Sequence, residues 1–407
     1  MSSAISLNFP QRLHIAGEVL SGSVNLDLAA AQEDDIENII VKFRGSIQTM
    51  IRRTIGQETR VYRSNTSVLN TDIPLWQRGQ PGSGTITLPF NFQLLPNLPP
   101  SYHVMRFDKQ GTITYYLEVV GERPGLHFNR RIRSVIALIP GGWPANVQIR
   151  QGLLSGWGPN MPWKAHTHMD SIRQGIWGDH SQVRVELRLP DIAAFPYGTP
   201  IPVRLDVVTT TKPLKQDDIP DENDDKALFP APPTAPALIT FRVDRHTQLA
   251  ARHVLGTTRE TVSDEFDNLA GFGEDDPSGG SVRCWQDPPI WAAAPKEEHH
   301  HRSLFHHRDK EGGDEKRVCT RATHFETVVQ FTFPPNFQTE HITTTHTLHV
   351  CVPFPGIGND LKLDIPINIV SGYVPQTQPM QQYQPAAAMN LPPAYWSAED
   401  HEFDEKD

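Results

Sequence analysis

Apolar and polar residues alternate along several segments of the chain. The alternation is regular over 183–189 (VRVELRL) and 239–243 (ITFRV), and it is longest over 361–369 (LKLDIPINI). Successive side chains of a β-strand point to opposite faces, so each segment is predicted to be a strand with one buried and one solvated face. Pro366 is on the polar side of its segment and indicates an edge strand, because proline donates no backbone hydrogen bond. Similar patterns predict strands at 19–28, 38–48, 85–93, 112–121, 132–139, 201–210, 325–333 and 346–352.

The predicted strands fall into two groups, at 1–140 and 181–372. No segment has a convincing apolar stripe of helical period, and we expect at most one or two helical turns, near 247–253. The 36 prolines agree with this, because proline breaks helices. Short strands punctuated by Gly and Pro, without alternating helices, are typical of antiparallel sandwiches. We therefore predict an all-β fold of two tandem antiparallel, immunoglobulin-like sandwiches, joined at 141–180 by a connector with a few buried aromatic anchors.

Three stretches lack this alternation and are predicted to be disordered. Residues 213–237 join an acidic run to a Pro-rich piece, and residues 261–317 are rich in Asp, Glu, Gly and His. Residues 373–407 form a tail that is first rich in Pro and Gln and then acidic. Such compositions bury too little apolar surface to offset the entropy lost on ordering. We expect the two insertions and the tail to be dispensable for folding.

The net charge of −10 comes from two short acidic runs. Residues 217–225 carry −6 and residues 399–407 carry −5, so the remainder of the chain is close to +1. We expect no nucleic-acid partner, because domains that bind nucleic acids are usually strongly basic. The three Cys are more than 30 positions apart, which argues against a disulfide framework. No apolar run is long enough to span a membrane and residues 1–10 lack the features of a signal peptide, so we expect a cytoplasmic protein.

The order and spacing of several segments resemble the arrestin-like proteins. The resemblance covers about 1–140 and, less closely, 181–212 and 325–372. It implies an arrestin-type fold and the class of α-arrestins, or arrestin-related trafficking adaptors, whose tails recruit HECT-type ubiquitin ligases through WW domains. The segments that carry it are 17–28 (GEVLSGSVNLDL), 36–49 (IENIIVKFRGSIQT), 88–103 (LPFNFQLLPNLPPSYH), 111–125 (GTITYYLEVVGERPG) and 346–372 (HTLHVCVPFPGIGNDLKLDIPINIVSG).

The tail contains Pro392-Pro393-Ala394-Tyr395, which fits the Pro-Pro-x-Tyr pattern that WW domains bind. Two prolines pre-set a polyproline II turn, so little entropy is lost on docking into an aromatic groove, and Tyr395 would fill a second pocket. The motif lies beyond the last predicted strand, where a ligand is accessible. We predict that Pro392, Pro393 and Tyr395 bind a WW-domain HECT-type ubiquitin ligase. The alternative is an incidental match in a Pro-rich linker.

Two other Pro-rich matches receive different interpretations. The segment 99–102 (PPSY) lies inside the first predicted sandwich, and we expect it to be structural rather than a WW ligand. Pro233, Thr234, Ala235 and Pro236 match a motif recognised by the sorting machinery of multivesicular bodies, and they lie in a predicted loop. Low-complexity Pro/Ala sequence also produces such matches by chance, so both interpretations of this second motif stay open.

Arginines cluster in the first predicted sandwich. Guanidinium groups suit phosphates, so these residues are candidates for binding anionic lipids or phosphorylated tails. The alternative is that they are ordinary residues of solvated strand faces. The first group consists of Arg52, Arg53, Arg60 and Arg63, and the second of Arg130, Arg131 and Arg133.

Candidate chemistry is otherwise sparse. Imidazole binds transition metals, but a structural zinc site needs about four fixed ligands, and the histidines at 299–301, 306 and 307 lie in a predicted disordered insertion. The sequence has no G-x-S-x-G, H-E-x-x-H, P-loop or G-x-G-x-x-G signature. We expect no catalytic residue, no cofactor and no metal site.

These patterns together predict a non-catalytic trafficking adaptor. The sandwiches would bind the tails of plasma-membrane transporters or receptors, and the tail motif would bring a ubiquitin ligase to that cargo. Tethering raises the effective concentration of the ligase and would promote ubiquitination and endocytosis at the plasma membrane and endosomes. One alternative is an endosomal coat or retrieval scaffold of the same fold that recruits no ligase. Another is a metal-binding protein that uses the histidine cluster, which metal stoichiometry would test.

Overall fold

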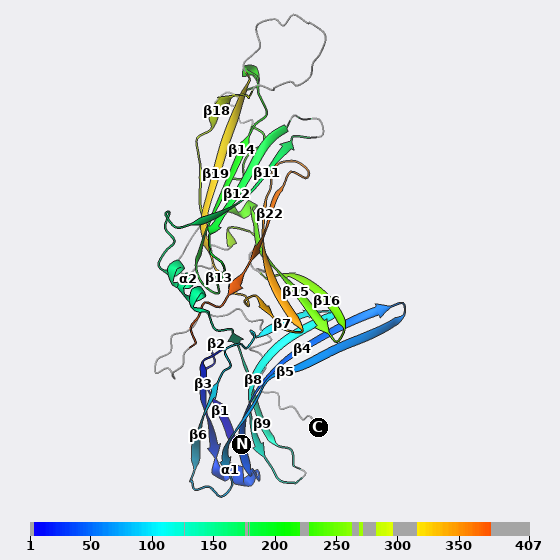
Figure 1. Ribbon diagram of the computed structural model, residues 1–407, viewed down its shortest axis with the longest axis vertical. Helices are drawn as coiled ribbons and strands as arrows, with labels where there is room; N and C mark the ends of the chain where they lie inside the picture. Colours follow the sequence, from blue (N-terminus) through cyan, green and yellow to red (C-terminus); the bar gives the residue numbers. More distant parts are fainter. Residues whose placement is uncertain are drawn as a thin grey trace, which may run out of the picture.

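The computed structural model of the chain describes residues 4–125, 127–175, 178, 180–219, 228–262, 268–271, 282–295 and 316–375. Two β-sandwich bodies follow one another along the long axis of the molecule (Figure 1). This architecture confirms the predicted all-β fold of two sandwiches. The strand pairs are antiparallel except for two parallel pairs of two residues each, which are β2 (His14–Ile15) with β10 (Leu138–Ile139) and β13 (Phe195–Pro196) with β23 (Ile369–Val370).

The first sandwich encloses a core of aliphatic and aromatic side chains between two sheets. Alternate residues of β4, from Ile39 to Ile51, are buried, as the period of two predicted. Helix α1 (Leu28–Glu33) begins after Asp27, whose carboxylate accepts hydrogen bonds from the first turn. One sheet has the order β1 (Ile5–Asn8), β3 (Val19–Asp27), β6 (Thr85–Gln93). The other has the order β5 (Glu58–Gln77), β4 (Asn38–Ile55), β8 (Lys109–Glu122), β7 (Tyr102–Arg106), with β9 (Arg130–Ile136) also on β8.

The second sandwich has its own core between two further sheets. Within the described residues Pro366 lies in a strand, β22, whose one sheet partner is β21, which confirms the predicted edge position. One sheet has the order β11 (Trp163–Arg173), β12 (His180–Pro190), β14 (Ile201–Thr210), β19 (Arg317–Val329), β17 (Arg283–Gln286), with β18 (Ile290–Ala293) also on β19. The other has the order β16 (Val254–Thr261), β15 (Thr240–Ala251), β21 (Ile342–Val352), β20 (Phe337–Gln338), with β22 (Leu361–Ile367) on β21.

Strands β15 and β21 contribute to both cores. Phe241 of β15 is buried in the second core, whereas Leu249 and Ala251 at the other end of the same strand are buried in the first core. Ile342, at the start of β21, also belongs to the first core. The predicted helical turn near 247–253 is therefore wrong, because these residues form the end of β15 and its turn into β16. The physical reason is that this segment packs between two sheets, where the backbone pairs with β21 and β16.

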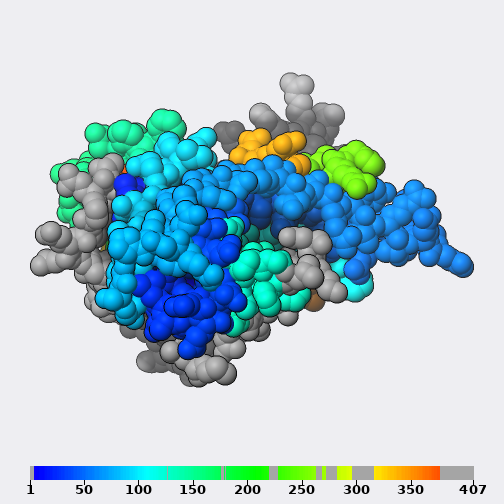
Figure 2. Space-filling view, turned by 90° about the horizontal axis from the view of Figure 1, so that it is seen from below, coloured from blue at the N-terminus to red at the C-terminus, as the bar shows by residue number. Residues whose placement is uncertain are grey.

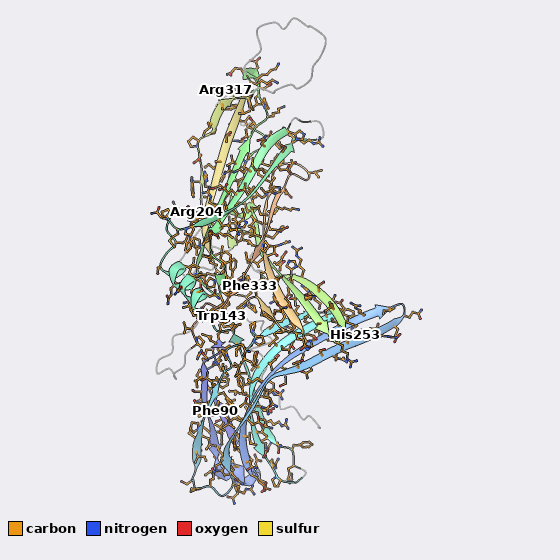
Figure 3. All side chains as sticks on the ribbon, in the orientation of Figure 1. Phe90, Trp143, Arg204, His253, Arg317 and Phe333 are labelled. Atoms are coloured by element: carbon orange, nitrogen blue, oxygen red, sulfur yellow. The ribbon has the colours of Figure 1, made fainter. Side chains whose placement is uncertain are left out.

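The range predicted as a connector contains regular structure. Helix α2 (Pro144–Leu154) buries Leu153 in the second core, and β11 is an edge strand of the second sandwich. Trp143, expected among the aromatic anchors, is 77% exposed at the start of α2 (Figure 3). Alternation is weak in this range because β11 has exposed residues on both faces. The exact domain bounds at 140 and 181 stay predictions.

Parts of the stretches predicted to be disordered have regular structure. Strands β17 and β18 lie within 261–317, the 3-10 turn η1 (Gln216–Asp218) lies within 213–237, and the 3-10 turn η2 (Pro236–Leu238) begins in that range and ends one residue beyond it. At the start of the predicted tail, Gly142 N donates to the carbonyl of Tyr373 at 2.7 Å, and Arg150 lies over the Tyr373 ring. Tyr373 packs against a small third core that joins the sandwiches and contains Tyr197. These segments contact neighbouring elements although their own apolar and polar residues do not alternate. Composition therefore predicted disorder where the chain has regular structure or defined contacts.

Candidate functional site

Two features of the sequence analysis lie outside the described residues. They are the predicted WW ligand, Pro392, Pro393 and Tyr395, and the histidines at 299–301, 306 and 307, where no metal site is expected. Both expectations stay predictions. Within the described part of the chain, no group of three or more His, Cys, Asp and Glu residues is arranged to hold a metal ion. No helix among the described residues has the length and hydropathy needed to cross a membrane.

The segment 99–102 is structural, as predicted. Tyr102 is 1% exposed, its hydroxyl lies 2.5 Å from the Thr247 side-chain oxygen, and the Arg245 guanidinium stacks 4.8 Å from the ring centroid. Burial raises the pKa of Tyr102, so the phenol stays protonated. A WW domain needs an exposed tyrosine, and this one joins the first sandwich to β15 of the second.

The contacts around Tyr102 extend into a polar network between the two sandwiches. Arg245 donates to the Glu260 carboxylate from Nε at 2.8 Å, and Thr49 donates to the carbonyl of Ala250 at 2.6 Å. His346 is buried against the ring of Phe333, with 4.9 Å between the ring centroids, and Figure 3 shows Phe333 near the middle of the long axis of the molecule. Burial lowers the pKa of His346 to about 3, so the imidazole is neutral near pH 7. The contacts of Thr49 with Ala250 and of Tyr102 with Thr247 join residues far apart in the sequence and connect the two sandwiches.

The first arginine group does not form one cluster. Cross-strand neighbours share a face, and successive residues of a strand alternate between faces. Arg53 is opposite Arg60 on one face of the β4–β5 hairpin, whereas Arg52 and Arg63 are on the other face. Arg53 donates to the carbonyl of Leu255 at 2.9 Å, and the Arg52 guanidinium lies 5.2 Å from the centroid of the Phe107 ring. The single cluster suggested by the sequence is therefore corrected to two pairs on opposite faces.

The second arginine group is largely engaged by carboxylates. Arg130 forms two hydrogen bonds with Asp34, at 2.9 and 3.2 Å, and these bonds lower the pKa of the Asp34 carboxyl. Arg133 donates to Glu118 at 3.1 Å. Arg131 is exposed, on the same face of β9 as Arg133. This group therefore offers a partner less unpaired charge than its sequence suggests.

The motif at Pro233, Thr234, Ala235 and Pro236 is packed against the second sandwich. Pro233 is buried, Ala235 and Pro236 are half-buried, and only Thr234 is exposed. The Cys284 thiol donates to the carbonyl of Thr234 at 3.3 Å. A sorting motif must be extended and accessible, so the accessible loop expected here is wrong for these residues. Recognition of the motif stays a prediction that would require the segment to detach.

Two further features had no signal in the sequence. His324 of β19 lies between two carboxylates, Asp206 at 2.6 Å and Asp287 at 3.1 Å, and stacks on Trp285. In addition, the β7–β8 turn carries Phe107, which is 87% exposed beside the β4–β5 hairpin. The pairing of charges across neighbouring strands depends on strand register, and the approach of two separate turns depends on tertiary packing. The sequence pattern contains neither kind of information.

Comparison with known proteins agrees with this architecture. The model of the arrestin (or S-antigen) N-terminal domain matches residues 3–141, which is the whole first sandwich. The fold therefore defines a tandem β-sandwich protein of the adaptor and scaffold kind. The match over residues 3–141 supports an arrestin-like family. Proteins of this family are generally non-enzymatic and bind cargo and trafficking partners. A search of the curated proteins finds no match to the chain.

Proposed function

We propose that this protein is a non-catalytic trafficking adaptor that binds membrane-protein cargo and recruits a WW-domain HECT-type ubiquitin ligase. The observation that carries the proposal is the combination of an arrestin N-terminal domain at 3–141 with a Pro-Pro-x-Tyr motif at 392–395. The adaptor itself catalyses no covalent step. It places a ligase beside the cargo, so that ubiquitin transfer becomes a near-intramolecular event and promotes endocytosis.

The position of the motif suits this role. Pro375, the last residue of the chain that the structure describes, lies against Gly17 and Gly141 at the junction of the two sandwiches. Sixteen residues separate Pro375 from Pro392. Even when fully extended, the chain from Pro375 to Pro392 spans at most ~60 Å, so a ligase bound at the motif stays within that distance of the junction. Cargo held by either sandwich is then within reach of the same ligase.

Cargo would be the cytoplasmic tail of a plasma-membrane transporter or receptor, and the working location would be the cytoplasmic surface of the plasma membrane and endosomes. The arginines of the β4–β5 hairpin support an anionic partner in the same place. Within the described residues Arg52, Arg53 and Arg63 have no carboxylate partner, so their charge is available to lipid or protein phosphates.

The test is titration of a WW domain against the full chain and two tail variants. Tyr395→Ala is expected to weaken binding about thirtyfold, because buried aromatic anchors typically carry ~2 kcal/mol. Tyr383→Ala is the matched control, since it removes another tail tyrosine outside the motif, and it is expected to bind like wild type. Equal binding by wild type and Tyr395→Ala would exclude ligase recruitment at this motif. It would favour the alternative, an endosomal coat or retrieval scaffold of the same fold.

A further inference from the structure

One sheet of the second sandwich ends in an edge that is open within the described residues. Strand β19 pairs with β14 on one side, and on its other side β17 and then β18 follow it (Figure 1). The chain stays beside β19 between these two strands, because Asp287 N donates to the carbonyl of Ala322 at 3.1 Å. Within the described part of the chain no strand pairs with the outer side of β17 or β18. We call residues 283–287 the β17 edge.

The side chains of the β17 edge are exposed. All four residues of β17 are exposed, with Trp285 at 41% and the Arg283 side chain at 75%. Residues at alternate positions of a strand share a face, so Arg283, Trp285 and Asp287 lie on the same face of the sheet. An open edge also presents backbone N–H and C=O groups without partners, which favour pairing with another strand. The β17 edge therefore has both the backbone and the side chains of an interaction surface.

Open edges are commonly protected by prolines and charged residues. Pro288 and Pro289 have no backbone donor and restrict pairing on this edge to residues 283–287. The other long edge strand, β5, extends into the hairpin that projects from the body (Figure 2), and its exposed side chains are mostly polar. The β17 edge differs from β5, because it has an exposed tryptophan between two opposite charges.

These opposite charges are placed symmetrically about Trp285. If two copies of β17 pair in antiparallel fashion about a two-fold axis at Trp285, residue 283 of each copy lies opposite residue 287 of the other. Arg283 then faces Asp287 of the second copy, and the symmetry makes this ion pair twice. The two Trp285 side chains face each other at the centre. Opposite charges and aromatic side chains directly across from one another both stabilise antiparallel strand pairs. The β17 edge is therefore complementary to itself.

We propose that the β17 edge is a self-association surface, on which a second copy of this chain adds its own β17 and joins the two sheets into one. The charges remain accessible, although Arg283 contacts Glu326 at 3.3 Å and Asp287 contacts His324 at 3.1 Å. The Asp287 side chain is still 53% exposed. The inference goes beyond the proposed function and does not depend on it. A dimeric adaptor would carry two tail motifs, and two linked motifs bind with higher avidity than one.

The experiment is sedimentation velocity of the full chain over a series of protein concentrations. Wild type is expected to pass from monomer to dimer as the concentration rises. Arg283→Glu and Asp287→Arg, each alone, are expected to weaken self-association about tenfold or more, because both ion pairs across the dimer become pairs of like charge. Arg204→Glu is the matched control. Arg204 also contacts Glu326, at 3.0 Å, but it lies on β14 inside the sheet, so this variant is expected to associate like wild type.

An equimolar mixture of Arg283→Glu and Asp287→Arg tests the register directly. In a mixed dimer every facing pair has opposite charges, so the mixture is expected to recover the self-association of wild type. Trp285→Ala is expected to weaken self-association about tenfold, because aromatic residues at the centre of an interface contribute most to binding. At about 1 M salt the Debye length falls to ~3 Å, so the defect of Arg283→Glu is expected to shrink while that of Trp285→Ala persists.

Dimers in wild type and in the mixture, with monomers in either variant alone at the same total concentration, would support the proposal. Recovery in the mixture also requires that both variants are folded. Wild type that stays monomeric up to its solubility limit would overturn the proposal, and so would single variants that associate like wild type. A mixture that associates no more than its components would exclude this pairing. If Arg204→Glu weakened association as much as Arg283→Glu, the effect would come from Glu326 rather than from the edge, and the proposal would be wrong.

Discussion

Replacement of Tyr102 by alanine tests whether the junction between the sandwiches holds the molecule together. Tyr102 is fully buried, packs edge-on to Phe337 at 5.1 Å and contacts Thr247 and Arg245 of the second sandwich. Truncation of a buried aromatic ring costs ~3–5 kcal/mol, because transfer energy and packing are both lost. With ~2–4 °C per kcal/mol for a domain of this size, the melting temperature is expected to fall by roughly 6–20 °C.

Tyr102→Phe keeps the ring and removes the hydroxyl, so it measures the polar part of the contact. The Thr247 side chain would then be buried without this partner, which costs ~1–3 kcal/mol. Thermal melts followed by calorimetry give both values, and a Thr247→Val double-mutant cycle with Tyr102→Phe isolates the pair.

Two outcomes would refute the reasoning. If Tyr102→Ala melts within ~2 °C of wild type, a change equivalent to no more than about 1 kcal/mol, the ring is not packed at a junction. If Tyr102→Ala loses WW-domain binding below its melting temperature while Tyr395→Ala retains it, the segment 99–102 is the ligand. Wild-type WW affinity with a lowered melting temperature is the expected combination.

Two further predictions concern His324 in the second sandwich and the contact between Gly142 and Tyr373, where the predicted tail begins. Burial lowers the pKa of His324, but the hydrogen bonds and charges of Asp206 and Asp287 outweigh it and raise the pKa above 6.5. The stabilisation from this charged imidazole is complete below about pH 6.5 and is lost as pH rises through the raised pKa. Asp287→Asn should therefore lower the free energy of unfolding most at low pH. A difference in free energy of unfolding between this variant and wild type that does not change with pH would contradict the prediction. Gly142→Ala should detach the segment at Tyr373 from the junction, because a Cβ at residue 142 would lie 2.9 Å from the backbone N and O of Tyr373. Limited proteolysis checks this, since the variant should be cut after Gly372 faster than wild type. Gly152→Ala is the control, because a Cβ at that position meets nothing within 4 Å.

Alternation predicted the strands that have one buried and one exposed face. The strand predicted at 85–93 is β6, and that at 201–210 is β14, with the same bounds. The 20-residue strand β5 had no such signal, because its half-buried face carries Ser64 and Thr66 as well as Tyr62 and Val68, so apolar and polar residues do not alternate. Its position is set by pairing with β4, so a local pattern could not reveal it.

The candidate sites divide in the same way. The buried role of the segment 99–102 was predictable, because its place inside a strand-rich block argued against exposure. The grouping of Arg52, Arg53, Arg60 and Arg63 was not, because residues adjacent in sequence point to opposite faces of a strand. The hydrogen bond between His324 and Asp206 depends on the register of β14 with β19, which brings together residues 118 positions apart in the sequence.

The sequence by itself determined the fold class, most strands, the edge position of Pro366 and the presence of a Pro-Pro-x-Tyr motif. These depend on local chemistry, since alternation, turn residues and prolines act within a few positions of one another. Only the tertiary structure decided that β15 and β21 contribute to both cores. Such contacts join residues as distant as Thr49 and Ala250, 201 positions apart. They arise because each sandwich leaves apolar surface at its end, and burying that surface against the other determines which distant residues meet.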